Sequence, residues 1–157
     1  MHELNALDAE TAARELLRCC GSTRWAARMT AARPFRDLDD LLTRGDATWN
    51  ALAAADWLEA FAAHPRIGQR TSSAWASAEQ AGTSRASADV KDQLAAANRD
   101  YEARFGRVFI MCASGKSAAE MLAALRARMG NDSDTELRIA ADEQKKITRV
   151  RLEKLLA

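Results

Sequence analysis

The sequence predicts an all-α fold, organised as a single-domain bundle of about seven to nine helices over residues 1–157. Alanine dominates and leucine is plentiful, whereas there are only three Val, four Ile and two Pro residues. Unbranched side chains lose little freedom in a helix, so this composition favours helix over sheet. Apolar residues recur at helical spacing, and several of these stretches follow a good N-cap residue. No fixed-period repeat or low-complexity linker divides the chain, which is typical of one domain.

The N-terminal part of the chain contains clear helix start and stop signals. A first helix is expected from Asp8, a good N-cap, to Gly21, a good C-terminal stop. Ser22 should cap a second helix, which ends before Pro34. Three shorter helical segments should follow, around residues 38–42, from about Asp46 and from about Asp56.

The middle of the chain is expected to alternate helix and loop. Pro65 disfavours the α conformation at His64, so the preceding helix should stop there and residues 65–72 should form a loop. One helix is expected around Ser73–Gly82, and a long amphipathic helix from about Ser87 to Phe105.

The C-terminal third begins with residues 108–112, the one short continuous apolar run in the sequence. This run is either a buried extended connector or the start of a helix. Two Ser-x-x-Glu patterns follow, and each matches a capping box at a helix start. These patterns are Ser117 with Glu120 and Ser133 with Glu136; the second should open a last helix over about Ser133–Leu156.

Composition excludes several classes of protein. The 48% hydrophobic fraction excludes a disordered chain, and no apolar run is long enough to cross a bilayer. The first residues lack a secretory signal. The net charge of +1, with acids and bases interleaved, argues against a nucleic-acid binder. Three cysteines, two of them adjacent, make a poor disulfide framework, so a cytoplasmic location is expected.

Two generic site patterns can be rejected. The Gly115-Lys116-Ser117 sequence lacks the earlier glycine of a phosphate loop, because Ile110 occupies that position. Two histidines 62 residues apart and no spaced cysteine pair predict no metal site. Cys112 lies in an apolar run, where a buried inert thiol is the expected state.

His64 is the strongest candidate for catalysis. It lies at a helix end before a proline and a loop, where a scaffold can present a side chain to a cleft. An ordinary imidazole pKa near 6.5 suits proton transfer at neutral pH. Glu79 and Gln80 follow on the next expected helix; the carboxylate could fix the imidazole tautomer, and the amide could bind a polar substrate. Spacing alone also permits a structural histidine and a surface glutamate.

Several segments together resemble one known family. His64-Pro65-Arg66-Ile67-Gly68 is followed by Glu79-Gln80-Ala81-Gly82, by Arg104-Phe105-Gly106, by the stretch from Phe109 to Ser117, and by Lys146-Ile147-Thr148-Arg149-Val150-Arg151-Leu152. In order and spacing they resemble the 2-oxo-4-hydroxy-4-carboxy-5-ureidoimidazoline (OHCU) decarboxylase family of urate degradation. The resemblance extends over about Leu4 to Leu156.

The resemblance implies an all-helical carboxy-lyase that needs no cofactor and no metal and converts OHCU into (S)-allantoin and carbon dioxide. It implies that His64 and Glu79 are catalytic. The implied substrate-binding residues are Pro65, Gln80, Phe105, Phe109, Ile110, Met111 and Arg151. Some members have a serine three residues before the glutamate, where this chain has Ala76, with Ser77 next to it.

The alternative function is a non-catalytic helical module that binds a ureido metabolite or a protein partner. Under the enzyme interpretation the partner is the small-molecule substrate, with no nucleic acid and no membrane. A homodimer and a functional link with 5-hydroxyisourate hydrolase are left open by the sequence.

Overall fold

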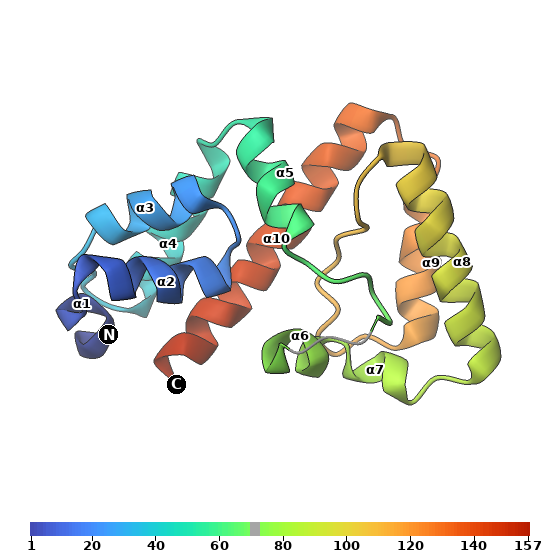
Figure 1. The fold of residues 1–157 in the computed structure, drawn as a ribbon, viewed down its shortest axis with the longest axis horizontal. Helices are drawn as coiled ribbons and strands as arrows, with labels where there is room; N and C mark the ends of the chain where they lie inside the picture. Colours follow the sequence, from blue (N-terminus) through green and yellow to red (C-terminus); the bar gives the residue numbers. More distant parts are fainter. Residues whose placement is uncertain (70–72) are drawn as a thin grey trace. The chain divides into compact units, whose positions relative to one another are not determined.

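The computed structural model describes residues 1–69 and 73–157, and this part of the chain contains ten helices and no strand (Figure 1). The predicted all-α class is therefore confirmed, with a helix count just above the expected seven to nine. The chain forms two compact units, one of residues 1–60 and 144–157 and the other of residues 61–143. The expectation of a single domain stays a prediction.

The first unit is built from short amphipathic helices that cap as predicted. Its helices are α1 (His2–Ala6), α2 (Ala9–Cys19), α3 (Thr23–Ala31), α4 (Leu38–Asn50), most of α5 (Ala54–Ala62), and the C-terminal part of α10 (Ser133–Leu156). The Asp8 carboxylate accepts the Thr11 backbone N–H at 2.9 Å, and the Ser22 hydroxyl accepts that of Trp25 at 3.2 Å. Both predicted N-caps are confirmed. In Figure 1, α2 and α3 pack side by side.

Helix α4 corrects one expectation, because it is continuous where two separate segments were predicted. Gly45 lies in its middle, and a side chain there would lie 3.5 Å from Leu152 and 3.6 Å from Trp25. The Trp25 indole N–H also donates to the Gly45 carbonyl at 3.0 Å. Close packing at this glycine therefore outweighs the ordinary cost of glycine in a helix.

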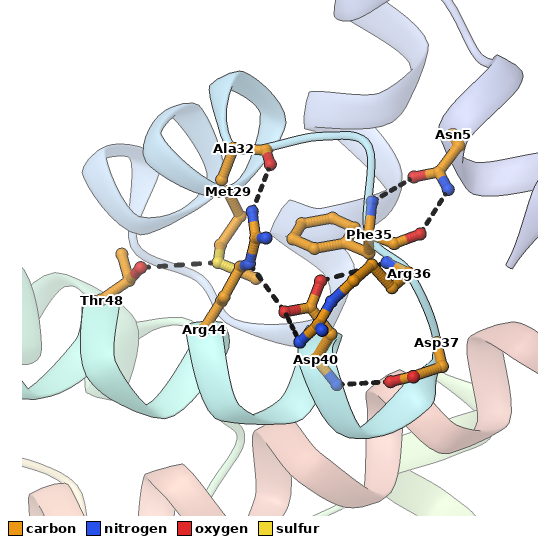
Figure 2. Close-up of polar contacts among 9 residues, drawn as sticks. All are labelled: Asn5, Met29, Ala32, Phe35, Arg36, Asp37, Asp40, Arg44 and Thr48. Carbon is orange, nitrogen blue, oxygen red and sulfur yellow. Dashed lines mark hydrogen bonds and ion pairs between the residues drawn. The ribbon is translucent and has the colours of Figure 1, made fainter.

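A polar cluster joins the start of α4 to the segment before it (Figure 2). The Asp40 carboxylate accepts the Arg36 backbone N–H at 3.0 Å and pairs with the Arg36 and Arg44 guanidinium groups at 3.2 and 3.0 Å. The Asn5 side chain bonds both backbone groups of Phe35, at 2.8 and 2.9 Å. Helix α1, which the sequence analysis missed, is held by these two hydrogen bonds of Asn5 to Phe35.

The second unit contains the end of α5, then α6 (Ala74–Glu79), α7 (Ala81–Ser84), α8 (Ala88–Phe105), α9 (Ala118–Arg128) and the first part of α10. Helices α8 and α9 lie side by side in Figure 1. Its core cluster comprises Ile67, Leu94, Ala97, Tyr101, Phe109, Ala113, Met121, Leu122 and Leu125. The single helix predicted over Ser73–Gly82 is wrong, since Gln80 separates two short helices.

The connections around α9 resolve the predictions for the C-terminal third. Residues 108–113 form an extended connector rather than a helix start. The capping box of Ser117 and Glu120 is confirmed. The second predicted box is wrong, because the Asp132 carboxylate accepts the Thr135 backbone N–H at 2.9 Å and the Glu136 carboxylate is used elsewhere. The last helix has the predicted bounds, Ser133–Leu156.

Neither described range, 1–69 or 73–157, contains a helix long and apolar enough to cross a membrane.

Candidate functional site

The HPRIG segment forms a turn and loop directly after α5. The His64 backbone N–H donates to the Phe61 carbonyl at 3.0 Å, and His64 lies two residues beyond the last helical residue, Ala62. His64 and Pro65 are both half-buried. The predicted end of the helix before the proline is therefore confirmed, and the imidazole lies where a helix gives way to a loop. Arg70 to Ser72, the last residues of the predicted loop, lie outside the described residues.

Side chains from other elements hold this loop in place. The Asn98 amide of α8 donates to the Ile67 carbonyl at 3.0 Å, and the Gly68 backbone N–H donates to Gln80 Oε1 at 2.8 Å. Arg66 pairs with Glu102 of α8 at 2.8 Å. Gly68 has a φ of 87°, which a residue with a Cβ rarely adopts. The loop that carries His64 is thus held by hydrogen bonds to two of its backbone groups, the Ile67 carbonyl and the Gly68 N–H.

Gln80 therefore joins the two motif segments. It lies at the break between α6 and α7, with φ −101° and ψ 19°, and is half-buried. Its side-chain oxygen accepts the Gly68 N–H through one of its two lone pairs, and its Nε2 group is the donor of the same amide. The sequence analysis expected the Gln80 amide to bind a polar substrate, and that role stays a prediction.

Glu79, the last residue of α6, is 9% exposed. It shares the buried face of α6 with Ala76, three residues earlier, whereas Ser77 is exposed on another face. A hydroxyl at Ser77 therefore points away from the face that carries Glu79. The pairing of Glu79 with His64 stays a prediction.

The glycine of the EQAG segment lies against the chain that leads into α9. A Cβ built on Gly82 would lie 2.1 Å from the Lys116 carbonyl oxygen, so no other residue fits without a backbone shift. Beside this contact is a cavity of about 520 Å³, lined by Glu79, Arg85 and Lys116 among others. The glycine thus allows the segment that carries Glu79 to pack directly on the turn before α9.

A second cavity, of about 1100 Å³, lies behind the HPRIG loop. Its cationic lining residues are Arg66, Lys91 and Arg99, and none of the described lining residues is acidic. The described lining residues are Arg66, Ile67, Gly68, Gln69, Ala74, Ser77, Ala78, Gln80, Ala81, Thr83, Ser84, Lys91, Leu94, Ala95, Asn98 and Arg99. Gln80 is the one predicted site residue in this set. The set includes Arg66, Ile67 and Gly68 of the HPRIG loop and leaves out His64.

The predicted apolar wall is part of the second unit's core. Phe109 is buried, with its ring centroid 5.2 Å from that of Tyr101. Phe105, at the end of α8, lies 4.7 Å from the same tyrosine ring, and Met111 packs against the core cluster. Ile110 is 2% exposed. The four residues lie within one short stretch of chain, and their contact with a substrate stays a prediction.

Arg151 belongs to the first unit, whereas the other eight predicted site residues belong to the second. It is half-buried on α10, where its Nη1 donates to the Arg18 carbonyl at 3.4 Å. Its role in holding a ligand together with His64 stays a prediction.

Four polar residues outside the predicted site hold the site segments. Asn98 binds the HPRIG loop, and Tyr101, Arg128 and Glu136 form a buried network beneath the extended connector. The sequence analysis assigned Glu136 to a capping box. A buried charge cannot be found from helical spacing alone, because charged residues are mostly exposed.

No group of three His, Cys, Asp or Glu residues in the described ranges is arranged to hold a metal ion.

Comparison with known proteins gives consistent matches. The sequence model of the OHCU decarboxylase family matches residues 5–153. The uric acid degradation bifunctional protein of Arabidopsis thaliana is 42% identical over 147 residues, which are 88% of this chain and 45% of that protein. The 2-oxo-4-hydroxy-4-carboxy-5-ureidoimidazoline decarboxylase of Haloferax volcanii is 30% identical over 97% of this chain and 96% of its own length.

Among solved structures, a crystal structure of OHCU decarboxylase in the presence of (S)-allantoin superposes with a TM-score of 0.82. It is 40% identical, and the match covers 90% of this chain and 96% of that one. The chain spans less than half the length of the two bifunctional relatives, from Arabidopsis thaliana and Bacillus subtilis, which it covers at 45% and 32%.

Proposed function

Because the chain belongs to the OHCU decarboxylase family, we propose that it catalyses the cofactor-independent decarboxylation of OHCU to (S)-allantoin and carbon dioxide. The observation that carries the proposal is the hydrogen bond from Gly68 to Gln80, which ties the HPRIG loop to the EQAG segment in a chain that the family model matches almost from end to end. The relative crystallised in the presence of (S)-allantoin supports the same product class.

The chemistry asks three things of the protein. Loss of carbon dioxide leaves an electron pair, which the substrate can delocalise into its own imine and carbonyl groups. The protein must align the breaking bond with that system, place donors where negative charge develops, and deliver a proton to one face. An apolar wall also favours the change from a charged carboxylate to neutral carbon dioxide.

We assign the proton transfer to His64, which transfers a proton to or from the substrate at neutral pH. Glu79 acts through it, since a carboxylate beside an imidazole fixes its orientation and stabilises its protonated form. The buried position of Glu79 on α6 supports this role, because a carboxylate removed from bulk water interacts more strongly with a cation.

Substrate recognition is assigned to the remaining residues. Gln80 offers its Nε2 group to a carbonyl oxygen of the substrate, while its own oxygen accepts the Gly68 N–H. The Arg151 guanidinium pairs with a carboxylate or ureido carbonyl in planar fashion. Pro65 and the apolar residues Phe105, Phe109, Ile110 and Met111 form the wall, with main-chain groups of the extended connector reading the ureido and ring amides.

The direct test follows the decay of freshly generated OHCU by ultraviolet absorbance and the handedness of the product by circular dichroism. We expect fast formation of (S)-allantoin, and the same rate after the protein has been dialysed against a chelator. Racemic allantoin at the rate seen without protein would end the proposal.

Substitution of His64 tests its assignment. His64→Ala should lower kcat by about 100-fold or more, because general acid–base catalysis contributes about 10²–10⁴. His2→Ala, which changes the other, exposed histidine, is the matched control and should keep wild-type turnover. A folded His64→Ala protein with near-normal kcat would remove His64 from the mechanism.

Arg151→Ala should chiefly weaken substrate binding. We expect KM to rise by at least about tenfold, which corresponds to about 1.4 kcal/mol, since a lost hydrogen bond to a charged group is worth about 1.5–3 kcal/mol. Unchanged Michaelis parameters would contradict its role.

The finer partner and location assignments belong to this proposal. A functional link with 5-hydroxyisourate hydrolase is supported by relatives named as bifunctional proteins of uric acid degradation. Homodimer formation and a cytoplasmic location stay predictions, which light scattering and cell fractionation would test.

A further inference from the structure

The extended connector has a backbone that no helix or sheet satisfies. Residues 108–113 lie outside any helix, so their carbonyl groups lack the intrahelical partners that neighbouring segments have. Ile110 is 2% exposed, and an unpaired buried carbonyl there would be costly. Its oxygen instead accepts a hydrogen bond of 2.7 Å from Nη1 of Arg128, and Arg128 is the last residue of α9. One guanidinium thus holds this stretch of main chain.

The same guanidinium is itself held by two residues, Glu136 and Phe109. Nε of Arg128 donates to Glu136 Oε1 at 2.8 Å, and Nη2 donates to the same oxygen. The guanidinium carbon lies 4.4 Å from the centre of the Phe109 ring, within cation–π range. Because the group is planar and all three nitrogens are engaged, its orientation leaves the Nη1 hydrogen aimed at Ile110.

Glu136 is in turn fixed by its own neighbours. It is fully buried, and its carboxylate accepts the Tyr101 hydroxyl at 2.6 Å and the Asn131 amide at 3.1 Å. Burial, together with the bond to Glu136, raises the pKa of Tyr101, so the phenol stays protonated and donates. The network therefore joins α8, α9 and α10 through a single carboxylate.

A buried ion pair is a poor source of stability, because desolvation offsets much of its attraction. The hydrogen bond from Arg128 to the Ile110 carbonyl is directional, so it fixes the position of that backbone group. The location of this pair beneath Ile110 therefore indicates a positional role.

We propose that Arg128 is a positioning residue for the decarboxylation, which holds the Ile110–Met111 main chain where it meets the substrate, and that Glu136 orients Arg128 for this purpose. The inference rests on the proposed function, in which groups of the extended connector read the ureido and ring amides. It gives Arg128 a role in substrate recognition through its bond to the Ile110 carbonyl of the extended connector, without direct contact between Arg128 and the ligand.

The sharpest variant is Arg128→Lys, which keeps a positive charge beside Glu136 and removes the planar fork. An ammonium is a point charge and cannot hold both the carboxylate and the Ile110 carbonyl in the guanidinium geometry. We expect KM for freshly generated OHCU to rise at least about tenfold, with a smaller fall in kcat. Arg126→Lys makes the same chemical change at an exposed position of α9, where the side chain contacts Gln93, and should leave KM within about twofold.

A second variant guards against loss of folding. Arg128→Met/Glu136→Leu removes both charges together, so no unpaired charge is left in the core, whereas the Ile110 carbonyl loses its partner. We expect a cooperative thermal transition together with the same rise in KM. A folded Arg128→Lys or double variant with KM within about twofold of wild type would overturn the positioning role. Failure of the wild-type protein to turn over OHCU would instead remove the proposed function, so the two failures are distinguishable.

Discussion

Gly82 gives the most exacting test of how the EQAG segment packs. The substitution Gly82→Ala adds one methyl group, whose carbon would lie 2.1 Å from the Lys116 carbonyl oxygen and 3.1 Å from the carbonyl carbon. Non-bonded heavy atoms reach their best separation at about 3.5–4.0 Å, so one backbone must move by more than about 1 Å. The obstacle is main chain, which cannot rotate away as a side-chain tip can.

The size of the effect follows from this contact. Overpacking costs about 1–3 kcal/mol, and the rigid backbone obstacle places Gly82→Ala in the upper half of that range. For a chain of about 150–250 residues, 1 kcal/mol lowers Tm by about 2–4 °C. We therefore expect the melting temperature to fall by about 4–12 °C.

Thermal unfolding monitored by circular dichroism at 222 nm measures this fall. The matched control is Gly130→Ala, because a Cβ at Gly130 meets no atom within 4 Å. It should be neutral or raise Tm slightly, since alanine reduces the freedom of the unfolded chain. Equal melting temperatures for the two variants would refute the close approach of Gly82 to Lys116.

Three further predictions concern groups away from the proposed chemistry. Burial raises the pKa of Cys19 to about 12 and that of Cys20 to about 11, so both thiols should resist alkylation at pH 8 until urea unfolds the protein; rapid modification of either, detected by mass spectrometry, would contradict this. The pKa of Asp40 lies below its ordinary value, chiefly because the Arg36 backbone N–H bonds to the carboxylate. The ionised carboxylate therefore contributes to stability above about pH 4, and this contribution is lost at lower pH. The difference in the free energy of unfolding between wild type and Asp40→Asn, measured in urea, should shrink between pH 6 and pH 3. Tyr101→Phe should lower the free energy of unfolding by about 1.5–3 kcal/mol, because it removes a hydrogen bond to the buried carboxylate of the network; an unchanged urea midpoint would contradict it.

Local signals in the sequence were sufficient for helix boundaries that depend on one side chain. The caps at Asp8, Ser22 and Ser117 and the bounds Ser133–Leu156 needed only the residues present there. The errors occurred where distant residues decide. Gly45 does not end α4, because Trp25 and Leu152 pack against it.

The candidate site shows the same division. Helix-end and loop chemistry placed His64 correctly before the loop, and the roles of Glu79 and Gln80 stay predictions. The bond between Gly68 and Gln80 depends on residues twelve positions apart across a segment without regular pattern, so no spacing rule predicts it. Glu136 was assigned to a helix cap because its local pattern fits one, whereas its partner Tyr101 lies 35 residues earlier.

The contact between Gly82 and the Lys116 carbonyl also restricts how this chain can vary in length. Loops between helices ordinarily accept inserted or deleted residues, because they run over the surface. The turn from Ser114 to Ser117 does not have that freedom, since the Lys116 carbonyl within it abuts α7, the helix that follows Glu79. Natural length variation should therefore concentrate at other turns, such as those at Gly106 and Gly130, and a single residue inserted between Gly115 and Ser117 should displace α7, the helix directly after Glu79 and Gln80.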